Sequence, residues 1–193
     1  MRRGAEIRSA TLLPLLWHLW LWVWLSLGLA GCEARGPERA FDRLRVAVGS
    51  RDARLLYQAL DSDSRWAVQS IWDYQRKVAR IVEARYPPGL RERELGRVAA
   101  AVRASSPAEF FAEVMAARGD PFAPLGGSVE ALGSFVRREG QEVVTSTGLR
   151  VPMGAGPDGG WGYTAFHEEL VRWRGAASND LKRLEEDAER ARP

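Results

Sequence analysis

The sequence predicts an α+β fold in which N-terminal helices pack on a small curved antiparallel sheet and a C-terminal helix closes the domain. Apolar residues recur every three or four positions over residues 38–119, as they do in helices. Short runs rich in valine, threonine and aromatic residues then alternate with glycine-containing turns over residues 128–166. A last helical pattern covers residues 166–191. Helices that precede a run of strands, instead of alternating with them, are typical of α+β domains.

The first two helices are predicted from their apolar spacing and from the residues at their ends. The spacing predicts a helix over 38–48, which Gly49 ends, because glycine is the commonest residue just past a helix. A second, shorter helix is predicted over 51–61, with Ser50 as its N-cap.

A long third helix follows, with the polar residues 62–64 as candidate N-caps. Its predicted inward stripe alternates steps of four and three and consists of Ala67, Ile71, Tyr74, Val78 and Ile81. The sequence YPPG at 86–89 ends this helix, because proline cannot continue the hydrogen-bond ladder.

Two further helices precede the strands. The spacing predicts one helix over 90–103. The next has the clearest local signal in the chain, with Ser106 as its cap, Pro107 at its first helical position and Glu109 placed to complete a capping box. Gly119 is expected to end it.

Three turns that contain glycine divide the strand region, at 139–140, 147–148 and 157–160. They predict three or four antiparallel strands in a meander. The strands are followed by one or two helices over 166–191, and the last turns, from Glu185 on, are almost wholly charged and are expected to extend into solvent.

The first 31 residues have the three-part layout of a secretory signal. Three arginines make the first eight residues basic, residues 11–31 carry no formal charge, and small residues precede Cys32, the only cysteine of the chain. Because the positive end stays cytoplasmic, the rest of the chain is expected to be exported. The alternative is an uncleaved transmembrane helix over 12–31, since about 20 residues are enough to cross a hydrocarbon core of about 30 Å.

Leu29-Ala30-Gly31-Cys32 resembles the lipobox of bacterial lipoproteins. The resemblance implies a diacylglyceryl thioether on Cys32, cleavage just before it, and acylation of the new amino terminus, typically with palmitate. Two or more acyl chains anchor a protein stably, so the resemblance implies a protein held to a membrane of the cell envelope by lipid. In such lipoproteins an aspartate just after the cysteine favours retention in the inner membrane. Glu33 occupies that position here, and the absence of the aspartate favours the periplasmic face of the outer membrane.

This interpretation divides the chain into a signal peptide over 1–31, a lipidated tether over 32–37 and a single globular domain over 38–193. With Cys32 consumed by lipid, the domain has no thiol for a disulfide, so it must fold by packing alone. About 155 residues are sufficient for one ordinary core.

Two stretches of the domain resemble the nuclear transport factor two-like superfamily, which has a cystatin-like cone fold. They are GPDGGWGY at 156–163, similar to the late hairpin of that family, and AFDRLRVAVGSRDARLLYQALD at 40–61, similar to its opening helix pair. The resemblance implies N-terminal helices on the concave side of a bent sheet. Five helices before the sheet and an added terminal helix depart from the family's pattern.

Charge and residue types exclude several classes of site. Residues 1–31 hold three of the 28 basic and one of the 25 acidic residues, so the rest of the chain has a net charge of +1 and no field to attract nucleic acid. His167 is the only histidine after the signal, and Val171 stands where a zinc-protease helix needs a second histidine. No metal site and no cofactor are therefore expected. His167 beside a cavity carboxylate remains a candidate general base.

Four further residues are candidate ligand contacts. Arg65 and Trp66 form a polar-aromatic pair suited to an anionic or aromatic ligand at a cavity mouth, and Trp161 with Tyr163 can line a mostly apolar pocket. The alternative for all four is helix capping, ion pairing and core packing.

Three functional hypotheses follow from the sequence. The first is a non-enzymatic, lipid-anchored domain that binds an envelope protein or a small apolar ligand. The second is a cone-fold enzyme that uses His167 with a cavity carboxylate. The third is an envelope scaffold that acts through its charged C-terminal helix.

Overall fold

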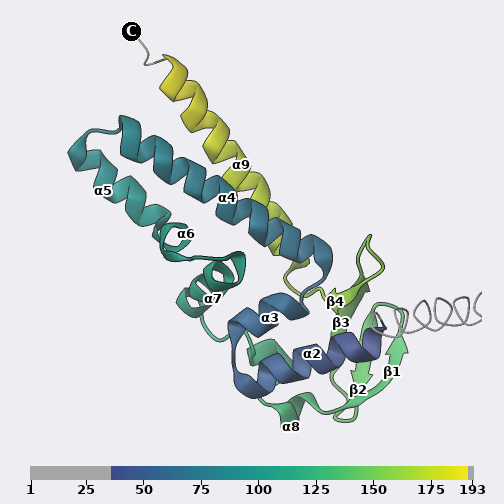
Figure 1. Ribbon diagram of the computed structural model, residues 1–193. Helices are drawn as coiled ribbons and strands as arrows, with labels where there is room; N and C mark the ends of the chain where they lie inside the picture. The colour runs from purple at the N-terminus through teal and green to yellow at the C-terminus, as the bar shows by residue number, and fades with distance from the viewer. Residues whose placement is uncertain (1–35, 191–193) are drawn as a thin grey trace, which may run out of the picture. The chain divides into compact units, whose positions relative to one another are not determined.

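The computed structural model describes residues 36–190, apart from the side chain of Ala188, and Pro37–Pro193 form one compact unit. The α+β prediction is confirmed (Figure 1). In the described part the helices are α2 (Pro37–Ser50), α3 (Ala53–Ala59), α4 (Ser62–Arg85), α5 (Pro88–Arg97), α6 (Ala99–Arg103), α7 (Pro107–Arg118), η2 (a 3-10 helix, Ala123–Leu125), α8 (Val129–Leu132) and α9 (His167–Arg190). The strands are β1 (Phe135–Glu139), β2 (Glu142–Thr145), β3 (Arg150–Ala155) and β4 (Trp161–Tyr163).

The strands form the predicted meander, with spatial order β1-β2-β3-β4 and antiparallel pairing throughout. Helix α2 covers one face of this sheet. Its apolar stripe is fully buried and consists of Ala40, Phe41, Leu44, Ala47 and Val48. The sheet contributes Val143, Val151, Met153 and Tyr163 to the same core. The core therefore lies between α2 and the sheet and continues into the helical part of the domain.

The predicted strand region begins with a helix instead of a strand. Residues 129–132 form α8, because the Ser128 hydroxyl accepts a hydrogen bond from the Ala131 amide and caps a single turn. Gly133, with φ of 77°, ends that turn and lets the chain enter β1.

The caps of α3 and α4 differ from those predicted. Asp52, not Ser50, caps α3, because Ser50 lies in the last turn of α2 and its hydroxyl donates to the carbonyl of Val46. Asp61 caps α4, and its carboxylate accepts from the amides of Asp63 and Ser64. In both cases an aspartate takes the capping position, two residues after the predicted Ser50 in α3 and one residue before the predicted caps in α4.

Helix α4 packs against α9 and the α5–α7 helices, and its buried face differs from the predicted stripe. Ala67 and Ile71 are buried as predicted, whereas Tyr74, Val78 and Ile81 are only half-buried. The other buried apolar residues of α4 are Val68, Trp72, Ala79 and Val82.

The indole of Trp72 donates a hydrogen bond of 3.1 Å to the carbonyl of Ala101 in α6. This contact explains why the single helix predicted over 90–103 is wrong. The chain turns at Val98, with φ of −113° and ψ of 13°, and α6 then packs against α4 at a new angle.

The start of α7 confirms the local prediction with one difference. The Ser106 hydroxyl accepts from the Glu109 amide at 3.2 Å, and Pro107 holds the first helical position. The Glu109 carboxylate accepts from both the amide and the hydroxyl of Ser105, one residue earlier than in a standard capping box. Gly119, with φ of 127°, ends the helix as expected.

Helix α9 follows the sheet in sequence but packs along α4, and the two long helices run parallel (Figure 1). His167 at the start of α9 lies beside Asp61 at the start of α4, and Leu184 and Tyr86 near the other ends line one groove. The region predicted to form one or two helices thus contains one helix, His167–Arg190, within the described residues. Its side chains from Glu185 to Arg190, other than that of Ala188, are exposed as predicted. None of the helices in residues 36–190 is long and apolar enough to span a membrane.

Candidate functional site

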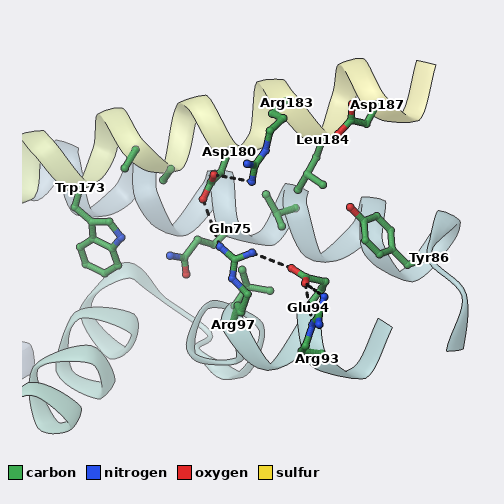
Figure 2. Close-up of a pocket in the computed structure, with 14 residues that line it drawn as sticks. Gln75, Tyr86, Arg93, Glu94, Arg97, Trp173, Asp180, Arg183, Leu184 and Asp187 are labelled. Carbon is green, nitrogen blue, oxygen red and sulfur yellow. Dashed lines mark hydrogen bonds and ion pairs between the residues drawn. The ribbon is translucent and has the colours of Figure 1, made fainter. Parts of the chain in front are cut away.

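A groove of about 510 Å³ runs between α5 and α9, with α4 beneath it (Figure 2). It is lined from α4 and its C-cap by Gln75, Val78 and Tyr86, from α5 and the residue after it by Arg93, Glu94, Arg97 and Val98, and from α9 by Trp173, Ala176, Ala177, Asp180, Arg183, Leu184 and Asp187. The groove is open to solvent between its two walls.

The lining of the groove changes from apolar at its base to charged at its rim. Val78, Val98, Trp173 and Leu184 contribute apolar surface. Trp173 is held in place on its other side, because its ring lies 5.6 Å from that of Phe110 in the core. A rigid aromatic side chain at the base of a groove is a common anchor for a bound chain.

The rim is a network of ion pairs that crosses the groove. Arg97 lies 2.9 Å from Glu94 on its own helix and 3.8 Å from Asp180 on α9. Asp180 also pairs with Arg183 at 3.2 Å. Hydrogen bonding to Arg97, supplemented by Arg93, lowers the pKa of Glu94, so this carboxylate is charged at neutral pH. These solvent-accessible pairs contribute little to stability and can exchange partners at little cost.

Helix α5 is the less firmly held of the two walls. None of its residues is buried, and its exposed side includes Leu90. It is joined to the domain by Pro87 at one end and by the non-helical Val98 at the other. The wall that faces α9 can therefore move without disrupting the core.

The four predicted ligand contacts do not share one pocket. Trp66 is 58% exposed on α4, where the Arg174 guanidinium lies 4.2 Å from the centre of its ring. Arg65 is half-buried, and its Nε is buried without a hydrogen-bond partner in the described part. Trp161 is half-buried on β4, whereas Tyr163 is 1% exposed. Burial raises the pKa of Tyr163 to about 12, so its phenol stays neutral inside the core.

The structure does bring His167 next to a carboxylate, as the enzymatic hypothesis requires. Its Nδ1 lies 3.6 Å from Oδ1 of Asp61, and the two side chains are 39% and 5% exposed. The Asp61 oxygens already accept from the Asp63 and Ser64 amides and from the Ser64 hydroxyl. A carboxylate at the adjacent starts of two parallel helices also stabilises the positive ends of both dipoles. The pair is therefore explained by the packing of α4 on α9, and His167 is not among the residues that line the groove.

The groove residues were only partly visible in the sequence. Trp173 and Leu184 stand out as apolar positions of the last helix, but their spacing does not show which of them faces solvent between two helices. Within residues 36–190 the structure brings together no group of three or more histidine, cysteine, aspartate or glutamate residues that would hold a metal ion. Cys32, the predicted lipidation site, lies outside the described residues.

Comparisons with protein-family models, with curated proteins and with solved structures found no match. The resemblances to bacterial lipoproteins and to the nuclear transport factor two-like superfamily therefore stay predictions.

Proposed function

We propose that this chain is a lipid-anchored lipoprotein of the bacterial cell envelope and that its folded domain is a non-enzymatic binding module. The groove between α5 and α9 holds an amphipathic helix of a protein partner. The observation that carries this proposal is the groove itself, which combines an apolar base with a charged rim on both walls.

The shape of the groove favours a helix over a small apolar ligand. From Trp173 to Asp187 it follows α9 for four turns, about 21 Å at 1.5 Å per residue. Small apolar ligands are usually enclosed in mostly apolar cavities, whereas this groove is open to solvent and has charged side chains on both sides. The Arg97–Asp180 ion pair that crosses it at 3.8 Å is exposed, so a bound helix can displace it at little cost. A helix with one apolar face and both signs of charge beside it matches such a lining.

The anchor is supported by the position of Cys32. It lies at the end of the uncharged segment and five residues before Pro37, where α2 begins. A tether of that length places the domain next to the membrane, where other envelope proteins are accessible. The anchor test is mass spectrometry of the protein from membrane fractions, with a Cys32→Ala variant as control. We expect a triacylated mature terminus and an unprocessed precursor for the variant, and a bare Cys32 would contradict the anchor.

The binding test places a photo-crosslinking residue at Ala176, which is exposed in the groove, and at Arg172, which is exposed on α9 but does not line the groove. We expect an adduct from position 176 only, and the peptide in that adduct should be an amphipathic helix. A synthetic copy of the peptide should bind the protein, and Leu184→Glu should weaken binding at least tenfold, because it puts a charge on the apolar base. Equal adducts from both positions, or binding unaffected by Leu184→Glu, would contradict the groove.

The exposed end of α9 supports a second function, a scaffold that acts through this charged helix. The side chains of Glu185–Asp187 and of Glu189 and Arg190 are exposed. A chain that ends at Leu184 keeps most of the groove but lacks these residues. If the truncated chain loses its partner while Leu184→Glu in the full chain keeps it, the scaffold is the correct function.

A further inference from the structure

A second candidate surface lies on the sheet, beside α2. Trp161, the first residue of β4, is half-buried between two arginines. The Arg43 guanidinium, from α2, donates a hydrogen bond of 3.0 Å to the carbonyl oxygen of Trp161. The Arg138 guanidinium, from β1, lies 5.1 Å from the centre of the indole ring. These three residues, Arg43, Arg138 and Trp161, are called the tryptophan patch below.

The two arginines of the tryptophan patch are exposed, and within residues 36–190 neither has a carboxylate at ion-pair distance. Two neighbouring arginines of the sheet differ in this respect. Arg137 pairs with Glu139 at 2.7 Å, and Arg150 pairs with Glu139 and Glu142 at 2.9 and 3.0 Å. Carboxylates of the sheet thus neutralise Arg137 and Arg150, whereas Arg138 on β1 and Arg43 on α2 have no such partner within residues 36–190.

An exposed apolar side chain flanks the tryptophan patch. Val46, 61% exposed, follows Arg43 by three positions on the same side of α2. An indole with adjacent guanidinium groups and an exposed valine has the residue types that proteins place at a membrane interface, where tryptophan lies at headgroup level and arginine pairs with phosphate.

The tether limits how far the tryptophan patch can lie from a membrane. Cys32 precedes Pro37 by five residues, which span at most about 18 Å when fully extended. Arg43 lies six residues further along α2, about 9 Å at the helical rise. Arg43 is therefore held within about 30 Å of the attachment point, and a tether of this length allows the tryptophan patch to reach the bilayer.

We infer that the tryptophan patch docks the domain on anionic phospholipid headgroups of the bilayer to which the chain is attached. The two guanidinium groups contact lipid phosphates, and the indole enters the interface together with the side chain of Val46. This inference rests on the membrane attachment in the proposed function. An uncleaved leader would keep the same reach, so the docking and the acylation of Cys32 can be tested separately.

The experiment uses the full chain, reconstituted into phosphatidylcholine vesicles with and without about 30% phosphatidylglycerol. The quencher is bromine on the acyl chains, carried either by the phosphatidylglycerol or by the phosphatidylcholine. The contribution of Trp161 is the difference in quenching between the native chain and Trp161→Phe, which cancels the other tryptophans. We expect Trp161 to be quenched by the anionic lipid, and about 0.5 M salt to reverse the quenching by screening.

Two double variants provide matched controls. Arg43→Gln with Arg138→Gln should lower the ratio of docked to undocked protein about fivefold for each arginine removed. Arg137→Gln with Arg150→Gln removes the same amount of charge from the neighbouring sheet surface and should have little effect, because Glu139 and Glu142 already neutralise these two arginines. Arg43→Lys with Arg138→Lys keeps the charge and should retain most of the docking, which separates loss of charge from misfolding.

Equal quenching by the two lipids, no effect of salt, or an equal loss in both glutamine pairs would overturn the docking. Mass spectrometry of the same preparation determines whether Cys32 is acylated. A bare Cys32 combined with quenching of Trp161 by the anionic lipid would contradict the acyl anchor and support the docking. An acylated Cys32 without such quenching would support the acyl anchor and contradict the docking.

Discussion

Gly162 on β4 lies close to the backbone of Leu60 and Asp61, just before α4. Replacing Gly162 with alanine should therefore lower the stability of the domain. A Cβ at this position would be 2.3 Å from the amide nitrogen of Asp61 and 2.4 Å from the carbonyl carbon of Leu60. Ordinary contacts of a Cβ begin at 3.4 Å, so β4 and the start of α4 would have to separate by about 1 Å. That movement breaks the hydrogen bond of 3.2 Å from the Asp61 amide to the Tyr163 carbonyl.

The magnitude follows from these contacts. A lost buried hydrogen bond costs about 1 kcal/mol, a disturbed N-cap at Asp61 about 1 kcal/mol, and the remaining steric strain about 1 kcal/mol. Gly162→Ala should therefore lower the free energy of unfolding by about 3 kcal/mol, which for a domain of this size lowers Tm by about 6–12 °C.

The matched control is Gly154→Ala, because Gly154 pairs directly with Gly162 across β3 and β4. Its Cβ would meet only the methyl group of Thr164, at 2.8 Å, and that side chain can move. This variant should cost about 1 kcal/mol or less. Urea unfolding followed by circular dichroism measures both. If the free energies of unfolding of the two variants differ by less than about 0.5 kcal/mol, a steric clash between β4 and the start of α4 is refuted.

Three further changes test the packing of the domain. Asp61→Ala removes the cap of α4 and should lower the free energy of unfolding by about 2 kcal/mol in a urea titration, and a loss below about 0.5 kcal/mol would contradict the capping role. Trp72→Phe leaves a buried carbonyl in α6 without its donor and should cost about 1–2 kcal/mol by the same measurement, with an unchanged midpoint as the contrary result. Hydrogen bonds from the Phe122 amide and from Arg51 lower the pKa of Asp120 in the folded domain below its ordinary 3.8. The charged Asp120 therefore stabilises the folded domain above pH 3.8, and this stabilisation is lost as the pH falls through the lowered pKa. Asp120→Asn should therefore make Tm depend less on pH between about 5 and 2.5, and two parallel Tm profiles would contradict this.

The parts of the fold that could be predicted are those fixed by residues close together in the sequence. The start of α7 depends on Ser106, Pro107 and Glu109, all within one helical turn, and its end depends on the left-handed backbone of Gly119. The meander was likewise predicted from turns whose glycines lie between neighbouring strands. Such local signals predict an element without any information about contacts to distant residues.

The features that could not be predicted depend on contacts between distant residues. Asp61 becomes the cap of α4 because its own amide is fixed by the Tyr163 carbonyl, 102 positions later in the chain. The helix predicted over 90–103 breaks at Val98 because Trp72 binds the carbonyl of Ala101. Neither contact has a signature in the local pattern.

The candidate site shows the same division. Trp173 and Leu184 are apolar positions of a charged helix, which the sequence shows, but the groove exists only because α5 folds back along α4. The tryptophan patch also depends on three elements, since Arg43, Arg138 and Trp161 come from α2, β1 and β4. Its special feature is two arginines that have no carboxylate partner in the part of the chain that the structure describes, and this becomes visible only once the ion pairs are assigned in space.

The absence of core residues in α5 has a consequence for how the domain selects its partners. A segment that contributes nothing to the interior can open at little energetic cost, so its amides should exchange with solvent far sooner than those of α4, which hydrogen-exchange mass spectrometry can measure. One side of the recognition surface is then adjustable and the other, α9, is fixed. A groove with one adjustable wall can bind helices whose side chains differ in size, and its selectivity would come from the residues of α9.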